Sequence, residues 1–112
     1  NGQRSRAELY YHDAFEALAE AHPNFRYIPV LSDEAADSGW SGARGFAHEA
    51  AVEAFGNDFR GHKAYLCGPP VMIEACISAL MQGRLFERDI YTEKFLSAAD
   101  AQQVRSPLFK AI

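Results

Sequence analysis

The chain has 112 residues, is 48% hydrophobic and carries a formal net charge of −4, a composition typical of one ordinary globular domain. It contains no cluster of Lys and Arg and no apolar run near the ~20 residues of a membrane span, so we expect neither nucleic acid nor a membrane as a partner. Its two cysteines, Cys67 and Cys76, lack the number and spacing of a disulfide framework, a zinc site or an iron–sulfur ligand set. We therefore expect no metal in this chain and a cytoplasmic location.

The first predicted elements are a helix and a strand. Ser5-x-x-Glu8 has the form of a capping box and predicts a helix that opens there and ends before Pro23. The nearly continuous apolar run at 25–31 predicts a strand buried on both faces, as in a parallel sheet. Pro29 within this run cannot donate a ladder hydrogen bond, so it favours a place at the edge of the sheet.

The alternation continues after a polar loop at 32–45, in which Trp40 is the only large apolar side chain. Trp40 is expected to be a packing anchor or, alternatively, to flank an adenine ring. The further predicted elements are helices at 46–55 and 71–82, strands at 62–67 and 89–95, and a tail at 98–112 without an assigned structure. The order α, β, α, β, α, β predicts an α/β fold of the doubly wound kind with a parallel sheet.

The turn between the strand at 62–67 and the helix at 71–82 reads Cys67-Gly68-Pro69-Pro70. Gly68 allows a sharp turn and the close approach of a flat ligand, and Pro70 suits the first position of a helix. Ligands of open α/β sheets bind at the carboxyl ends of strands, which would place Cys67 at the lip of a crevice. A buried structural cysteine and an ordinary turn from strand to helix remain open as alternatives.

Longer motifs around this turn carry a family resemblance. They are Tyr65-Leu66-Cys67-Gly68-Pro69-Pro70-x-Met72, Tyr91-Thr92-Glu93-Lys94-Phe95 and Trp40-x-Gly42-x-x-Gly45. In this order they resemble the ferredoxin–NADP reductase superfamily, and within it the NADH-binding domain of reductase components of bacterial multicomponent oxygenases, of the phenol hydroxylase and toluene monooxygenase type. The resemblance runs along essentially the whole chain.

The resemblance implies a place in an electron path. A reductase of this kind passes a hydride from NADH to FAD and then single electrons through a [2Fe–2S] centre to the hydroxylase component of an oxygenase. The motifs of the ferredoxin module, the FAD module and the pyrophosphate loop do not occur in this chain. NADH would therefore be the cofactor of this chain, whereas FAD and [2Fe–2S] would belong to the parent protein and not be bound by this chain alone.

The same resemblance predicts that the chain is a fragment. The sheet of the family has the order 3-2-1-4-5, and this chain would form a partial doubly wound parallel sheet that lacks the first strands. Its strands would present bare edges. We expect the isolated chain to be inactive, and its sheet to be completed by the missing FAD and ferredoxin modules of the same polypeptide, by a dimer or by a strand swap.

The resemblance also assigns residues to the nicotinamide end of the site. Cys67 would lie beside the reactive carbon and position the ring for hydride transfer. Residues 68–70 would shape the turn beneath it, and Met72 would line the same pocket or be a plain core residue. Glu93 would relay a proton or stabilise charge, or be no more than a charged pair with Lys94 at a strand end, and Phe95 would shield the flavin. In many relatives this aromatic residue ends the chain, whereas here residues 96–112 follow it.

At the adenosine end, Ser32 and Asp33 follow the predicted strand at 25–31. Relatives that use NADP place an arginine where this chain has Asp33, so a carboxylate that repels a 2′-phosphate favours NADH. Arg4 could meet a phosphate, or form a surface salt bridge. The pair Ser32-Asp33 could equally cap a solvated turn.

Two other classes of function stay open at this point. One is a non-enzymatic adaptor that docks on an oxygenase or on another reductase chain. The other is a thiol redox module that uses Cys67. The predicted organisation is a portion of an NAD(P)-binding reductase domain at 1–97 followed by the tail at 98–112.

Overall fold

The computed structural model describes residues 1–94, 110 and 111. The chain divides into two compact units, Asn1–Ala50 and Ala51–Ile112, and each unit is described by itself. The predicted boundary between 97 and 98 lies outside the described residues and stays a prediction. None of the described helices is both long and apolar enough to cross a membrane.

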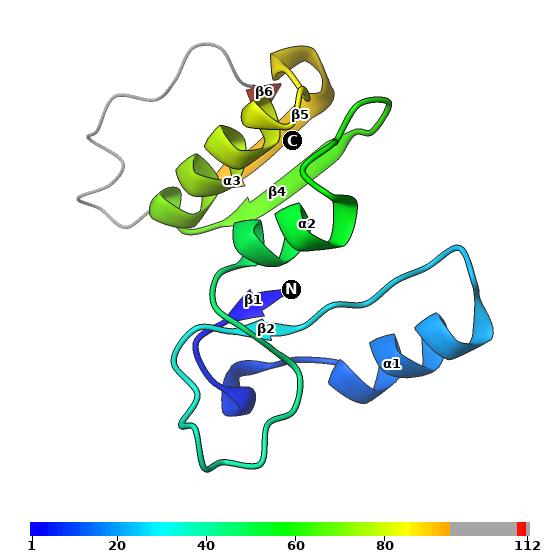
Figure 1. Ribbon diagram of the computed structural model, residues 1–112, viewed down its shortest axis with the longest axis vertical. Coiled ribbons are helices and arrows are strands. Elements are labelled where there is room, and N and C mark those ends of the chain that lie inside the picture. Colours follow the sequence, from blue (N-terminus) through cyan, green and yellow to red (C-terminus); the bar gives the residue numbers. More distant parts are fainter. Residues whose placement is uncertain (95–109, 112) are drawn as a thin grey trace. The chain divides into compact units, whose positions relative to one another are not determined.

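The N-terminal unit is built on a small parallel sheet. Its strands β1 (Gly2–Gln3), β2 (Val30–Leu31) and β3 (Ala43–Arg44) pair in the order β1-β2-β3. Along the chain, a 3₁₀ turn, η1 (Arg6–Glu8), and the helix α1 (His12–Ala21) connect β1 to β2 (Figure 1). Both residues of β2 are 1% exposed, because the central strand of a parallel sheet is covered on both faces.

The predicted capping box is wrong. Ser5 makes no side-chain capping bond, η1 is a single 3₁₀ turn, and α1 begins only after Tyr11, whose φ of 52° is left-handed. The amide of Arg6 instead donates to Glu34 Oε1 over 2.9 Å. A carboxylate from a distant loop has thus replaced the local cap, which the sequence around Ser5 could not reveal.

The strand predicted at 25–31 is shorter than expected and lies elsewhere in the sheet. Only Val30–Leu31 forms a strand, and it lies between β1 and β3, so the predicted edge position is wrong. Pro29 immediately precedes β2, where its missing N–H interrupts no ladder. The ladder is short because β1 spans only Gly2–Gln3. The loop predicted at 32–45 likewise contains β3.

The C-terminal unit follows the predicted alternation closely. The helix α2 (Ala47–Phe55) leads into it from the N-terminal unit, and β4 (Ala64–Gly68), α3 (Pro70–Gln82), the 3₁₀ turn η2 (Glu87–Asp89), β5 (Ile90–Lys94) and β6 (Lys110–Ala111) follow. These three strands are parallel and pair in the order β4-β5-β6. Among the described residues, β4 pairs only with β5, so β4 is an edge strand.

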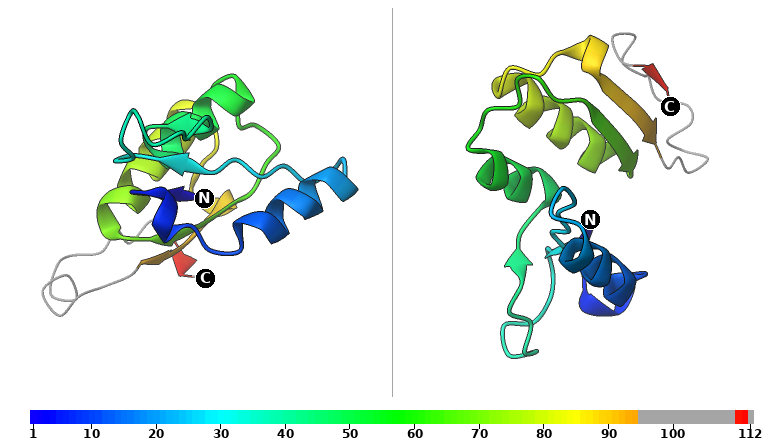
Figure 2. Two further views of the ribbon diagram at one scale, coloured as in Figure 1. Left: turned by 90° about the horizontal axis from the view of Figure 1, so that it is seen from below. Right: turned by 90° about the vertical axis from the view of Figure 1, so that its right-hand side faces the viewer.

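The helix α3 provides half of the buried core cluster of this unit. Ile73, Ile77 and Leu80 recur at helical spacing and pack with Ile90 of β5, and Ile73 and Ile90 are 0% exposed. Figure 2 shows β4 and β5 side by side with α3 against one face of the sheet. Burial of each such side chain stabilises the fold by roughly 1.5–3 kcal/mol. The α/β fold class with parallel strands is confirmed.

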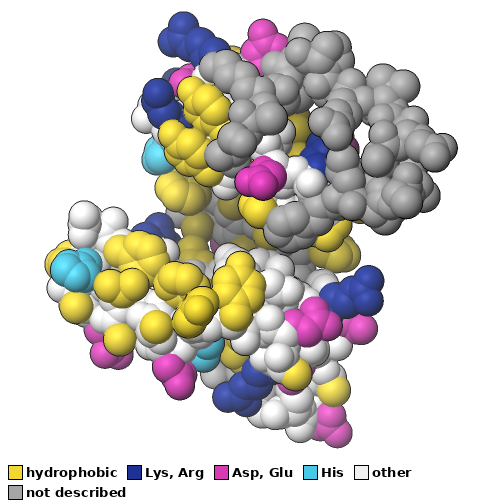
Figure 3. Space-filling model, turned by 180° about the vertical axis from the view of Figure 1, so that it is seen from behind, with side chains coloured by type: hydrophobic (Ala, Val, Ile, Leu, Met, Phe, Trp, Pro, Cys, Tyr) yellow, Lys and Arg dark blue, Asp and Glu magenta, His cyan; other side chains and the backbone are white. Residues whose placement is uncertain are grey.

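Both units leave large apolar side chains on the surface (Figure 3). Tyr11 is 75% exposed, Tyr65 is 66% exposed and Val71 is 83% exposed. In α1 no residue is buried. Exposed apolar area of this extent is common where further protein surface binds.

Candidate functional site

The turn between β4 and α3 has the geometry expected from its sequence. Pro69 is the extended N-cap of α3 and Pro70 its first residue, and the carbonyl of Pro69 accepts a 3.0 Å hydrogen bond from the amide of Ile73. Gly68 has a φ of +155°, which side chains disfavour, and a Cβ at this position would overlap Cε of Met72. The structure therefore needs glycine at position 68 and places Met72 directly against it.

Cys67 and Glu93 are direct neighbours across the sheet. The parallel register pairs Tyr65 with Tyr91 and Cys67 with Glu93, and both Cys67 and Glu93 are exposed. Paired residues on adjacent strands point to the same face. A thiol and a carboxylate predicted from separate motifs thus lie side by side at the carboxyl ends of β4 and β5.

An aromatic pair extends the same face toward the start of the strands. The rings of Tyr65 and Tyr91 stack with centroids 5.1 Å apart and planes 11° from parallel. They alternate with Leu66 and Thr92, which belong to the face that α3 covers. The open face of β4 and β5 therefore carries a stacked tyrosine pair beside the pair of Cys67 and Glu93.

The opposite face of the same strand ends is braced by an ion pair. Lys94 pairs with Gly68 in the register, and its Nζ lies 2.7 Å from Oε1 of Glu74 on α3. The side chain of Lys94 is 16% exposed and that of Glu74 54% exposed. This link between β5 and α3 was not predicted, because the sequence gives no sign of which charged residues face each other.

The two cysteines have opposite environments. Cys67 is exposed, whereas Cys76 on α3 is buried, and burial raises the pKa of the Cys76 thiol. A protonated thiol in an apolar environment is inert. The alternative of a buried structural cysteine therefore describes Cys76 and not Cys67.

The residues predicted at the adenosine end also come together. Ser32 and Asp33 follow β2, Arg4 follows β1, and the two strands are parallel neighbours. The amide of Asp33 donates to the carbonyl of Arg4 over 2.7 Å, and that of Ser32 donates to Gln3 over 3.0 Å. All three predicted residues are exposed at the carboxyl end of the sheet, the position at which open α/β sheets bind ligands.

The loop between β2 and β3, residues 32–42, is held by polar contacts that sequence reasoning missed. Arg44 donates from its guanidinium to the carbonyl oxygens of Glu34 at 2.7 Å, Ala35 at 3.3 Å and Trp40 at 3.1 Å. The carboxylate of Glu34 accepts the amide of Arg6. This hydrogen bond is the main reason why the pKa of Glu34 is lowered. The signals available in the sequence were only two charged residues near a glycine-rich loop.

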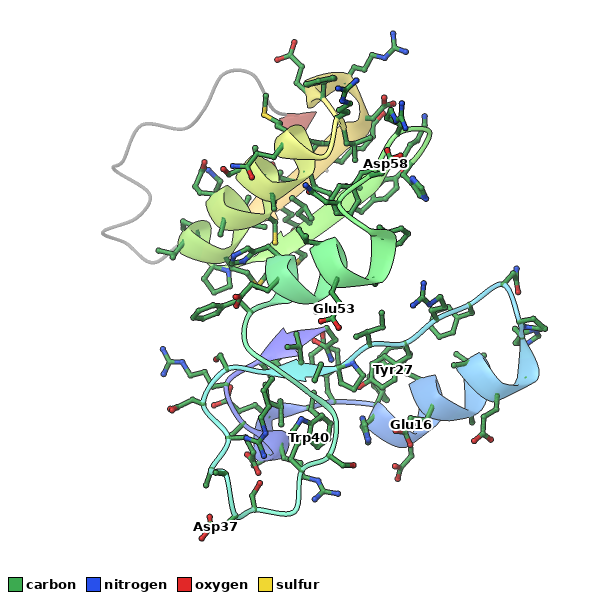
Figure 4. All side chains as sticks on the ribbon, in the orientation of Figure 1. Glu16, Tyr27, Asp37, Trp40, Glu53 and Asp58 are labelled. Carbon is green, nitrogen blue, oxygen red and sulfur yellow. The ribbon has the colours of Figure 1, made fainter. Side chains whose placement is uncertain are left out.

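Trp40 lies inside this loop and points back toward η1 (Figure 4). Its Nε1 donates to the carbonyl of Ala43 over 3.0 Å, and the guanidinium carbon of Arg6 lies 5.8 Å from its ring centroid. Gly42 has no room for a Cβ because the Trp40 ring lies against it. These contacts are those of the predicted packing anchor; a role beside adenine stays a prediction.

One group of potential metal ligands occurs among the described residues. Candidate ligand atoms of His12, Asp13 and Glu16 lie within 4.8 Å of one another. Both nitrogens of His12 are already engaged, since Nδ1 lies 2.9 Å from the hydroxyl of Tyr27 and Nε2 lies 3.1 Å from Glu16 Oε1. This arrangement links α1 to the segment before β2, and the absence of a metal stays a prediction.

Comparison with known proteins identifies the family. Residues 1–77 match the oxidoreductase NAD-binding domain family, and the chain belongs to this family. The predicted resemblance to the ferredoxin–NADP reductase superfamily is thereby confirmed. The remaining predicted residue of the nicotinamide end, Phe95, lies outside the described residues.

Several individual relatives carry the names of hydroxylase, monooxygenase and cytochrome P450 reductase proteins. The chain is 58% identical to "Phenol hydroxylase P5 protein" of Acinetobacter pittii and 56% identical to "Phenol 2-monooxygenase, reductase component DmpP" of Pseudomonas sp., over 99% of this chain and 32% of each relative. The crystal structure of the Amycolatopsis cytochrome P450 reductase GcoB matches with a TM-score of 0.74 and 42% identity, over 84% of this chain and 27% of that one. The chain thus spans about a third of the length of the curated relatives it matches.

Proposed function

We propose that the chain carries part of the NADH site of a reductase that delivers electrons to an oxygenase. The observation that supports this proposal best is the register of β4 and β5, which pairs Cys67 with Glu93 at the carboxyl ends of parallel strands in a member of an NAD-binding family. The oxygenase part of the proposal is supported by two relatives whose names refer to phenol hydroxylase and phenol 2-monooxygenase.

The residues of the chain fit a nicotinamide ring on chemical grounds. Cys67 is small, polarisable and exposed, whereas Gly68 beside it is buried against Met72 of α3 and shapes the turn that holds Cys67. NADH supplies a hydride when it is bound. Cys67 would position the ring without trapping it, and Glu93 would offer a carboxylate that can accept or return a proton.

At the other end of the dinucleotide, Asp33 would choose between cofactors. Its exposed carboxylate follows β2 and can accept hydrogen bonds from the free hydroxyls of an adenosine ribose. The same carboxylate repels a 2′-phosphate. We therefore infer a preference for NADH over NADPH, with Ser32 beside Asp33 and Arg4 available to a phosphate of the dinucleotide.

The rest of the electron path would lie in other parts of a longer polypeptide. FAD would take the hydride and a [2Fe–2S] centre would pass single electrons to the hydroxylase component, as the family resemblance implies. A protein that draws on NADH in this way would work in the cytoplasm. The exposed edge of β4 would pair with the missing strands, or with a second chain by dimerisation or strand swap.

A chimeric reductase tests the proposal, because the chain needs partner modules to turn over. The chain would replace the matching third of the Pseudomonas relative, and NADH oxidation would be followed with an artificial electron acceptor. Cys67→Ala and Glu93→Gln should each lower kcat about 10- to 100-fold with little change in KM, as expected for groups that act on the reacting atoms.

The matched control is Glu87→Gln, which removes another exposed carboxylate of the same unit. It should leave both constants at the values of the unsubstituted chimera. A chimera that reduces its acceptor from NADH equally well with and without Cys67 and Glu93 would refute the assigned roles. A folded chimera that does not oxidise NADH at all would refute the proposed function.

A further inference from the structure

We propose that Arg44 is a positioning residue of the nucleotide site: its guanidinium holds the β2–β3 loop in the shape that presents Asp33 to the adenosine ribose. This inference rests on the proposed NADH function and deepens it. It starts from a side chain that would not itself touch the ligand, since the hydrogen bonds of its guanidinium go to backbone carbonyls of the chain.

The location of Arg44 is fixed by the sheet. Arg44 is the last residue of β3 and pairs with Leu31 in the register. The next amide, that of Gly45, donates to the carbonyl of Leu31 over 2.9 Å. Because Leu31 is buried and immediately precedes Ser32, the backbone of Arg44 is anchored directly beside the start of the loop.

From this anchor the guanidinium spans both arms of the loop. Its Nη1 donates to Glu34 and its Nη2 donates to Ala35, both just after Asp33, while Nη2 also donates to Trp40 on the returning arm. A planar fork with several fixed donors can serve three carbonyls at once, whereas a lysine ammonium offers only a point charge on a flexible stem. One side chain therefore ties the two arms of the loop together.

The loop is also tied to the segment that follows β1, which includes Arg4 and the first residue of η1, Arg6. The carboxylate of Glu34 accepts the amide of Arg6, and the carbonyl of Arg4 accepts the amide of Asp33. Asp33 thus lies between a backbone bond toward β1 and the bonds of Arg44 toward β3. A binding loop held in this way loses less conformational entropy when a ligand orders it.

The loss of Arg44 should therefore weaken nucleotide binding without touching the chemistry. In the chimeric reductase, Arg44→Ala should raise the KM for NADH about tenfold and leave kcat unchanged, because Cys67 and Glu93 belong to the other unit. The KM for NADPH should change less, since a carboxylate that is no longer held in place repels the 2′-phosphate less. The KM of Arg44→Lys for NADH should lie between that of the unsubstituted chimera and that of Arg44→Ala.

Arg26→Ala is the matched control, since Arg26 is an exposed arginine of the same unit, and it should behave as the unsubstituted chimera. Amide hydrogen exchange of 32–42 provides a second readout, because exchange should accelerate in Arg44→Ala and not in Arg26→Ala. An unchanged KM for NADH in an active Arg44→Ala chimera would overturn this inference alone. If the unsubstituted chimera is folded but does not oxidise NADH, the proposed function fails and the inference falls with it.

Discussion

Replacing Gly68 with alanine tests whether the turn between β4 and α3 is as constrained as its geometry indicates. Gly68 is buried, has a φ of +155° and faces Met72, whose Sδ would lie 3.3 Å from an added Cβ and whose Cε would overlap it. The substitution therefore imposes two separate costs. One is a strained backbone, and the other is a displaced methionine side chain.

The size of the effect follows from these two costs. A residue other than glycine in a sparsely populated backbone region costs about 1–3 kcal/mol, and an off-rotamer Met72 about 0.5–1.5 kcal/mol. Alanine restricts the unfolded chain and returns about 0.4–1 kcal/mol. Gly68→Ala should thus lower the free energy of unfolding by about 0.5–4 kcal/mol. Gly61→Ala should cost less, because Gly61 has a φ of +80° and open space around its Cβ position.

Urea unfolding of the C-terminal unit would measure these free energies through far-UV circular dichroism. Trp40 fluorescence would report separately on the N-terminal unit, because Trp40 is the single tryptophan and lies there. The double variant Gly68→Ala with Met72→Ala should recover the part of the loss that Met72 causes. Equal losses for Gly68→Ala and Gly61→Ala, with no coupling to Met72, would show that the turn is not constrained as we describe.

Three further outcomes are expected. The lowered pKa of Glu34 means that its hydrogen bond to Arg6 stabilises the loop above the ordinary glutamate pKa of 4.5 and is lost as the pH falls through the lower folded value. The protection of the loop amides, measured as their exchange rate relative to that of an unstructured chain at the same pH, should decrease there, and Glu34→Gln should remove this pH dependence. Iodoacetamide should label Cys67 in the folded chain but Cys76 only after unfolding, because Cys67 is exposed and Cys76 is buried. Peptide mass spectrometry would measure both labelling rates, and equal rates would contradict the burial of Cys76. Ile73→Ala should cost about 2–5 kcal/mol in the same urea assay, because Ile73 is fully buried; a loss below that of an exposed site would refute the assigned core.

The sequence predicted those elements whose local signals agree with their packing. For α3, a proline at the first position, apolar residues at helical spacing and Gly83 at the C-cap all indicate one helix, and Pro70–Gln82 forms it. The two-residue strands β1 and β3 carry no such signal. Gly2 becomes a strand residue only because Val30 lies beside it, and no local pattern reveals a partner so distant in the chain.

The candidate site was predictable as a set of residues but not as an arrangement. Cys67 and Glu93 were predicted from separate motifs, and only the register of β4 and β5 makes them neighbours. Arg44 was missed because its hydrogen bonds go to backbone carbonyls. Any residue supplies a backbone carbonyl, so the amino-acid sequence does not reveal these partners.

The two faces of β4 and β5 have different roles at the turn: the open face carries the proposed site residues, and the face covered by α3 holds the turn in place. Successive residues of a strand point to opposite faces, so Cys67 and Glu93 reach the open face while Gly68 and Lys94 reach α3. On the α3 side, Met72 fills the space that Gly68 leaves, and Lys94 bonds to a carboxylate of the helix. The backbone that carries Cys67 is therefore continuous with a packed residue, Gly68, on the α3 side. This is why a change at Gly68, which would not contact the nicotinamide, should affect both stability and hydride transfer.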